Sequence, residues 1–211
     1  RRPDRVVVGA DTEADFEILR RVYPQFTNHV RIRYIEASPE TAESIKYVAN
    51  TLLLTYISFW NGVGARLGET FPEINMEALK LGVTADNRIS TWGSYVSNGA
   101  GGSCFGKDIK SLIYQLKQQN HNTDLLQAVY RTNEYQKYYL IDRAEHEAGF
   151  NFNQKTVALL GLSFKKHTND MRDSSALTVV KTLLGRGVSE IRAYDPLANE
   201  EAQRYLNPKE N

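Results

Sequence analysis

The only cysteine of the chain lies in a segment whose composition suits a reactive thiol better than a core side chain. Residues 101–108 read Gly-Gly-Ser-Cys-Phe-Gly-Lys-Asp, so glycines precede Cys104, and Lys107 and Asp108 follow it. Glycine lets backbone approach closely. A nearby lysine stabilises a thiolate and a carboxylate can hold a proton, the conditions under which cysteine becomes a nucleophile. The segment therefore favours a catalytic Cys104 over the alternative, an inert buried thiol.

Composition excludes several other kinds of function. The 211 residues include 26 basic and 25 acidic side chains, so the formal net charge of +1 gives no field that would attract nucleic acid or an anionic membrane. No apolar run is long enough to span a bilayer, and the four histidines lack the spacing of metal ligands. We therefore expect neither a membrane segment nor a metal site. The single cysteine and the absence of a secretory leader indicate a cytoplasmic location.

The middle of the chain is predicted to be helical. Ser38 followed by Pro39 is typical of a helix start, and the helical pattern continues to about Leu67. Such a helix, roughly 40 Å long at about 1.5 Å per residue, needs another helix or a second subunit along its length. Further helices are predicted at residues 74–80, 108–117 and 124–148.

The two ends of the chain show strand patterns instead. Strand, helix and strand are predicted at residues 5–10, 11–23 and 31–35, and again at residues 156–162, 173–184 and 190–194. Units of this kind build parallel, doubly wound sheets. The predicted fold class is therefore α/β with a central all-α dimerisation region, a helical core flanked by pieces of two Rossmann-like domains. The expected boundaries are residues 1–37, 38–150 and 151–211.

Three blocks of sequence, in matching order and separation, resemble the nucleotide-sugar dehydrogenases, the UDP-glucose/GDP-mannose dehydrogenase family. The blocks are residues 43–51, the cysteine segment 101–108, and residues 160–165 together with 170–174. The resemblance covers essentially the whole chain. It implies a first Rossmann-like domain for NAD, whose glycine-rich fingerprint would precede residue 1, then a helical dimerisation region and a second Rossmann-like domain for the substrate's nucleotide. We therefore expect a fragment of a longer enzyme, inactive by itself.

The resemblance also implies a reaction. Enzymes of this family are cytoplasmic oxidoreductases that oxidise the C6 alcohol of a nucleotide sugar to the carboxylate, converting UDP-glucose to UDP-glucuronate with two NAD for polysaccharide biosynthesis. Cys104 would add to the intermediate aldehyde, and the thiohemiacetal would become a thioester that water hydrolyses. By resemblance Lys46 stabilises the oxyanion, Asn50 holds the same oxygen or the water, and Asp108 assists proton transfer. Lys46 and Asn50, four residues apart, would share one helix face.

Binding roles follow from the same resemblance. Arg88 matches an arginine that reaches into the neighbouring subunit's substrate site, which implies a homodimer or a higher homo-oligomer. The residues assigned to the substrate by resemblance are Arg88, Tyr95, Gly101, Phe164 and Lys165, and those assigned to the cofactor are Lys107 and Arg172. The alternative for each lysine or arginine is a solvated surface charge. Asp195, at a strand end, could meet a ribose hydroxyl or simply end the strand.

Two departures from the family pattern bear on the substrate. Residues 90–100 differ from the family where its members cradle the sugar nucleotide, and Gly106 replaces a frequent proline. Three alternatives therefore stay open beside UDP-glucose oxidation: the same chemistry on GDP-mannose, the same chemistry on a UDP-N-acetylhexosamine, and a non-catalytic dimerisation scaffold.

Overall fold

The chain has the α/β fold that its sequence predicts, in a computed structural model that describes residues 3–206. Contacts divide the chain into two compact units, Arg1–Asn50 and Thr51–Asn211. This boundary falls inside the long helix α3 (Pro39–Phe59). The three-part division at residues 1–37, 38–150 and 151–211 stays a prediction.

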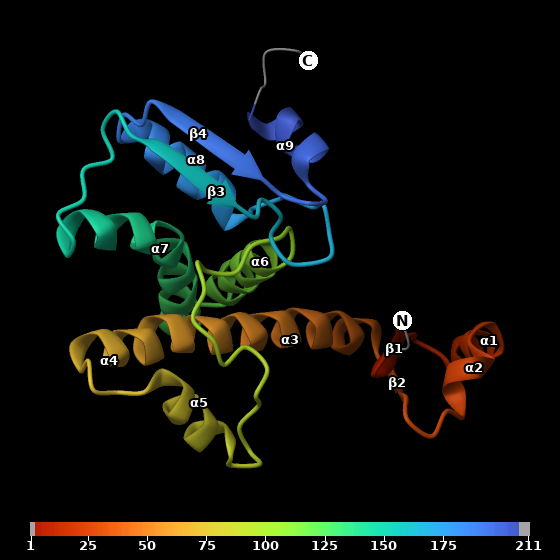
Figure 1. The fold of residues 1–211 in the computed structure, drawn as a ribbon. Coiled ribbons are helices and arrows are strands. Elements are labelled where there is room, and N and C mark those ends of the chain that lie inside the picture. The colour runs from red at the N-terminus through yellow and green to blue at the C-terminus, as the bar shows by residue number, and fades with distance from the viewer. Residues whose placement is uncertain (1–2, 207–211) are drawn as a thin grey trace. The chain divides into compact units, whose positions relative to one another are not determined.

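The first unit is built on two parallel strands (Figure 1). Arg20 of the helix between the strands donates to Glu36 on the second strand, with its Nε 2.6 Å from Oε1. A Cβ on Gly9 would lie 2.9 Å from the Cα of Pro39, so glycine lets the first strand end against the start of α3. The predicted strand at residues 31–35 is displaced by two residues. The elements are β1 (Arg5–Gly9), α1 (Glu13–Val22), α2 (Pro24–Thr27) and β2 (Arg33–Ala37).

The second unit begins with the rest of the long helical run. The run reaches Thr70, slightly beyond the predicted Leu67, but it is not one regular α-helix. A π-helical turn interrupts it, an uncommon geometry in which the backbone bonds skip one further residue. A Cβ on Gly64 would lie 2.8 Å from the Trp60 ring, so the glycine leaves room for the indole in this turn. The segments are α3, the π-helix η1 (Trp60–Gly64) and α4 (Ala65–Thr70).

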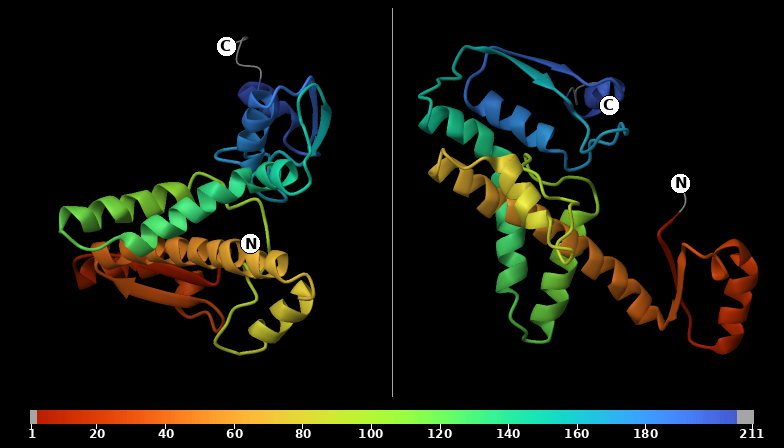
Figure 2. Two further views of the ribbon diagram at one scale, coloured as in Figure 1. Left: turned by 90° about the vertical axis from the view of Figure 1, so that its left-hand side faces the viewer. Right: turned by 60° about the horizontal axis from the view of Figure 1, so that its bottom comes forward.

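Three further helices complete the helical part. Asn75 caps α5 by accepting a hydrogen bond from the Ala78 N–H, so this helix starts later than predicted. Two longer helices, α6 and α7, form an antiparallel hairpin (Figure 2). Leu54 of α3, Ile109 of α6 and Val129 of α7 share one buried cluster, which packs these helices together. The helices are α5 (Met76–Thr84), α6 (Phe105–Gln118) and α7 (Asp124–His146).

The last part of the chain is a second strand-helix-strand unit, as predicted. Its two strands pair in parallel with Val157 opposite Ile191. Both of these side chains pack against a buried cluster that includes Ile141 of α7, so the unit and α7 share a core. A final helix was absent from the sequence prediction. The elements are β3 (Thr156–Leu160), α8 (Ser175–Gly185), β4 (Glu190–Tyr194) and α9 (Asn199–Leu206).

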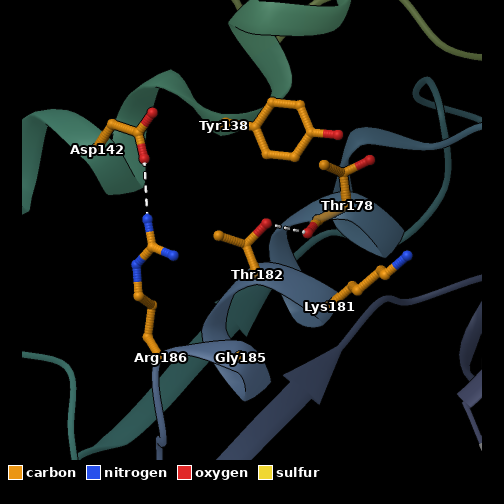
Figure 3. A pocket seen from close by; sticks show the side chains of 7 residues that line it. All are labelled: Tyr138, Asp142, Thr178, Lys181, Thr182, Gly185 and Arg186. Carbon is orange, nitrogen blue, oxygen red and sulfur yellow. Dashed lines mark hydrogen bonds and ion pairs between the residues drawn. The ribbon is translucent and has the colours of Figure 1, made fainter.

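A groove of about 510 Å³ runs between α7 and α8 (Figure 3). Arg186 reaches across it from the end of α8, with its guanidinium 3.3 Å from Asp142 and 2.9 Å from Glu145 on α7. Lys181 extends away from this pair in Figure 3. None of the predicted site residues lines the groove, and the ion pairs of Arg186 join the end of α8 to α7 across it.

Asp195 directly follows β4 and is 5% exposed. Its carboxylate accepts backbone N–H groups from Leu162 at 2.8 Å and Ser163 at 3.1 Å, beyond the end of β3, and from Leu197 and Ala198 ahead of α9. These bonds tie the two strand ends to the start of the last helix. They favour the structural alternative for Asp195 over contact with a ribose.

We expect Asp195→Asn to lower stability at neutral pH by about 1–3 kcal/mol, because an amide cannot replace a carboxylate that accepts four N–H groups. Burial would raise the pKa of Asp195, but these backbone hydrogen bonds hold it well below its usual range. Such a group stabilises the fold above its unfolded pKa of about 4, and this contribution is lost as pH falls through the folded value. Urea denaturation, followed by tryptophan fluorescence, measures the free energy of unfolding. The loss of this free energy in Asp195→Asn relative to wild type should be smaller at pH 2 than at pH 7. An equal deficit at both pH values would contradict this role.

Candidate active site

Cys104 is exposed and occupies the N-cap position of α6. The helix starts at Phe105, so the start predicted at Asp108 is wrong by three residues. Gly106 is a weak helix former and hides this start in the sequence, whereas Phe105 packs onto the core cluster and fixes it. The Asp108 N–H donates to the Cys104 carbonyl oxygen at 2.8 Å and closes the first turn. A helix N-terminus stabilises negative charge, which suits a thiolate nucleophile.

Asp108 lies one helical turn after Cys104 and is fully buried. The ammonium of Lys107 forms an ion pair with the Asp108 carboxylate. The Lys107 side chain is 57% exposed while that of Asp108 is 1% exposed, so the lysine spans from solvent to the buried acid. The carboxylate and the cation that follow the cysteine in the sequence therefore form an ion pair within the first turn of α6, and their roles toward the Cys104 thiol stay a prediction.

Two glycines allow the cysteine loop, residues 99–106, to touch the segment that follows β3. A Cβ on Gly101 would lie 2.3 Å from the Asp173 carbonyl oxygen, and a Cβ on Gly102 would lie 2.9 Å from the Phe164 ring. Gly102 also adopts φ +88°, which L side chains rarely adopt. Its N–H donates to the Arg172 carbonyl oxygen at 2.9 Å. Residues with side chains at 101 and 102 would push the two segments apart.

A cavity of about 640 Å³ lies beside the cysteine loop. Four of the five residues that the sequence assigned to substrate line it together: Tyr95, Gly101, Phe164 and Lys165. The lysine ammonium lies 5.0 Å from the centre of the Phe164 ring. Aromatic faces with a cation nearby can stack a ring and meet an anionic group.

Seven residues that line this cavity were not among those that the sequence assigned to the substrate, and two of them, Trp92 and Lys166, carry side chains suited to binding a nucleotide sugar. Trp92 lies in the divergent stretch 90–100, and Lys166 directly follows a predicted site lysine. The signal for Lys166 was its neighbour Lys165, and the signal for Trp92 was its place in the stretch where family members cradle the sugar nucleotide.

Arg88 is the fifth predicted substrate residue, and it does not line this cavity. Its side chain is 88% exposed and its guanidinium lies 2.6 Å from Asp86. This hydrogen bond raises the pKa of Arg88 and lowers that of Asp86. An exposed position is compatible with the predicted reach into a second subunit, which stays a prediction.

The two residues assigned to the cofactor, Lys107 and Arg172, do not line the cavity of about 640 Å³. Lys107 lines a smaller cavity of about 250 Å³ together with Ser103, Lys110 and Asp173. Arg172 lies outside that lining and pairs with Asp170 at 2.6 Å. The hydrogen bond with Asp170 raises the pKa of Arg172, and nearby Cys104 adds to the same effect.

The remaining predicted residues lie in the first unit. Lys46 and Asn50 are one turn apart on α3, as the spacing predicted.

Within residues 3–206, no helix combines the length and apolar character that a membrane crossing requires. The same residues contain no group of three or more His, Cys, Asp or Glu placed to share a metal ion.

Two parts of the chain match the domains of one known protein family. Residues 40–135 match the central domain of the UDP-glucose/GDP-mannose dehydrogenase family, and residues 158–210 match its UDP binding domain. The chain belongs to this family. The first match contains the cysteine loop, and the second contains Phe164 and Lys165 of the neighbouring cavity.

Individual members of this dehydrogenase family resemble most of the chain. UDP-glucose 6-dehydrogenase of Pseudomonas aeruginosa is 39% identical over 201 residues, which are 94% of this chain and 43% of that protein. A UDP-glucose dehydrogenase structure from Pyrobaculum islandicum is 33% identical with a TM-score of 0.84, covering 97% of this chain and 45% of that one. A UDP-D-ManNAc dehydrogenase from Pyrococcus horikoshii is 26% identical with a TM-score of 0.76, covering 92% and 44%. The chain thus spans less than half the length of these relatives.

We expect Gly101→Ala to disrupt the dehydrogenase cysteine loop, because the new methyl would meet backbone 2.3 Å away rather than a movable side chain. Overpacking of this kind typically costs about 1–3 kcal/mol. Thermal denaturation and the rate of Cys104 alkylation by iodoacetamide would measure both effects. Gly82→Ala is the matched control, since a Cβ there meets nothing within 4 Å. Equal stability and alkylation in the two variants would contradict the predicted clash.

Proposed function

We propose that this chain supplies the catalytic cysteine and the nucleotide-binding part of an NAD-dependent nucleotide-sugar 6-dehydrogenase that converts UDP-glucose to UDP-glucuronate. The observation that carries the proposal is the position of an exposed Cys104 beside a cavity. Gly101 and Phe105, on either side of the cysteine, line that cavity together with Phe164 and Lys165. A sugar held there would have its reacting carbon within reach of a nucleophile at a helix N-terminus.

The sulfur of Cys104 is the nucleophile of the proposed reaction. Once the C6 alcohol has been oxidised to the aldehyde, the thiolate adds to its carbon, and the carbonyl π electrons move to the oxygen. We assign Lys46 to stabilise that oxyanion and Asn50 to hold the same oxygen or the hydrolytic water. Loss of a hydride from carbon gives a thioester, and water then releases the carboxylate and the thiol. Asp108 holds or returns the proton of this exchange.

NAD supplies the hydride acceptor in both oxidation steps. The sequence contains no Gly-x-Gly-x-x-Gly turn of the kind that holds a dinucleotide, so this chain lacks the main cradle for the cofactor. Lys107 and Arg172 are the residues that we assign to contact it, as basic side chains that do not line the cavity of Lys165. Their task is to meet phosphate charge.

The cavity suits a nucleoside diphosphate sugar. Its lining combines two lysines, Lys165 and Lys166, with three aromatic side chains, Trp92, Tyr95 and Phe164. Cations meet the diphosphate, and an aromatic face can stack on a base or sugar. Because the similar Pyrococcus horikoshii protein is a UDP-D-ManNAc dehydrogenase, a UDP-N-acetylhexosamine is the second candidate substrate.

We also propose that the whole protein is a homodimer or a larger homo-oligomer. In the second unit, the run from α3 to α4 leaves four large apolar side chains between 40% and 65% exposed: Leu52, Phe59, Val63 and Leu67. Their spacing of seven, four and four residues keeps them near one side of the helix. A second subunit would cover this side and could bring Arg88 to a neighbouring substrate site.

The first test is the stoichiometry of NADH in the whole protein. We expect two NADH for each UDP-glucose and none beyond the first oxidation with Cys104→Ala, because the aldehyde then has no thiol to capture it. Gln115→Ala, on the exposed face of α6, is the control and should behave as wild type. Absence of NADH with UDP-glucose but not with a UDP-N-acetylhexosamine would select the second substrate. No NADH with any nucleotide sugar, GDP-mannose included, would instead support the scaffold alternative.

The second test addresses the subunit contact. Leu52→Glu should shift the protein toward monomer in sedimentation velocity, because a buried carboxylate in an apolar interface is costly. Leu125→Glu is the matched control, as Leu125 is similarly exposed, at 70% against 65% for Leu52. A sedimentation profile that both variants share with wild type would argue against this helix face as the interface.

A further inference from the structure

One face of α7 holds the cysteine loop through polar side chains. Asn133 binds both backbone groups of Ala100, accepting its N–H at 2.7 Å and donating to its carbonyl oxygen at 3.0 Å. Gln136 donates to the Ser97 carbonyl oxygen at 2.7 Å. Both side chains are buried, at 3% and 4% exposure. A helix thus fixes the loop backbone four residues before Cys104.

Lys137 continues this face but does not bind the loop backbone. Its side chain is only 1% exposed, and its ammonium lies 2.7 Å from Asp173 Oδ1 and 2.9 Å from Glu134 Oε1. Burial alone would lower the pKa of Lys137, but hydrogen bonds with Asp173 and Glu134 outweigh burial and raise the pKa. Lys137 is therefore a permanent buried cation. A buried charge is costly unless it is paired, so its partners are held in place.

Asp173 carries this constraint to the cysteine loop. Its carbonyl oxygen is the atom that a Cβ on Gly101 would meet at 2.3 Å, and its Oδ2 would lie 3.5 Å from a Cβ on Gly106. These two glycines stand three residues before and two residues after Cys104. Asp173 itself has φ +53°, a left-handed conformation that costs energy in a residue with a side chain. The ion pair with Lys137 stabilises a residue in that conformation.

We propose that Lys137 and Asp173 are positioning residues for Cys104. Lys137, on α7, fixes the Asp173 side chain, and Asp173 lies against the loop that presents the thiol, close to Gly101 before Cys104 and to Gly106 after it. The segment that ends at Asp173 also carries Phe164 and Lys165, which line the substrate cavity. The pair therefore fixes the position of the Cys104 thiol relative to Phe164 and Lys165. The proposal rests on the nucleophilic role of Cys104 given under the proposed function.

Loss of the ion pair between Lys137 and Asp173 should displace the Cys104 thiol. Neither residue is assigned to touch the nucleotide sugar, and Asp173 also lines the smaller cavity with Lys107, so the alkylation rate, which needs neither substrate nor cofactor, isolates the effect on the thiol. A displacement of about 1 Å in a reacting group can lower the rate about 100-fold while binding changes little. Withdrawal of the thiolate from the helix N-terminus removes a further stabilisation worth about two- to fivefold.

The decisive variant is Asp173→Asn in the whole protein. Asparagine tolerates a left-handed conformation, so the backbone is kept while the ion pair with Lys137 is lost. We expect kcat to fall about 100-fold with KM for the nucleotide sugar nearly unchanged. Alkylation of Cys104 by iodoacetamide at pH 7, measured well below the melting temperature of the variant, should slow about two- to fivefold. Asp142→Asn, which removes a carboxylate from the α7–α8 ion pair in Figure 3, is the control.

Lys137→Met completes a double-mutant cycle with Asp173→Asn. Lys181→Met is its control, because it makes the same substitution on α8, away from the cysteine loop. If Lys137 acts through Asp173, the double variant should be no slower than Asp173→Asn alone. The proposal would be overturned if the losses of kcat in the two single variants multiplied in the double variant. It would also be overturned if Asp173→Asn kept the wild-type kcat and the wild-type rate of alkylation. Should Lys137→Met fail to fold, the Asp173→Asn result decides. Alkylation needs no substrate, so it tests the pair even if no nucleotide sugar yields NADH.

Discussion

The region around Cys104 depends on a contact between two backbones. The cysteine loop meets the segment after β3 so closely that Gly101 has no space for a Cβ beside the Asp173 carbonyl oxygen. The hydrogen bond from Gly102 to Arg172 lies in the same contact. Residues of both segments line the cavity. The same contact therefore shapes the cavity and positions the loop that carries the Cys104 thiol.

Helix α7 makes that contact rigid. Its apolar residue Val129 packs in the helical core, and Ile141 packs in the core shared with α8 and the strand pair. Between these two positions lie Asn133 and Lys137, which bind the cysteine loop and Asp173. One helix thus anchors both cores and carries the polar side chains between them. A loop of glycines and serines gains a fixed conformation from a helix that is itself held at two points.

Charges around the site are neutralised locally. Arg88, Arg172 and Lys107 each have a carboxylate partner within two residues, and Lys137 has two. Such pairs keep the net field small, in line with a formal charge of +1. An anionic ligand would therefore respond to the local arrangement of Lys165 and Lys166 in the cavity rather than to the charge of the whole chain.

The sequence by itself determined the α/β class, the family and the order of the elements except α2 and α9. Strand and helix periodicities are local properties, and Cys104, Lys107 and Asp108 are adjacent in the chain, so their proximity needed no tertiary information. Helix starts were less certain, since packing of Phe105 into the core, rather than local propensity, begins α6. Only the tertiary structure brought Tyr95 to Phe164, added Trp92 to the cavity and joined Lys137 to Asp173. These partners are separated by 36 to 72 residues, and contacts over such separations are decided by the packing of whole elements, which no local pattern records.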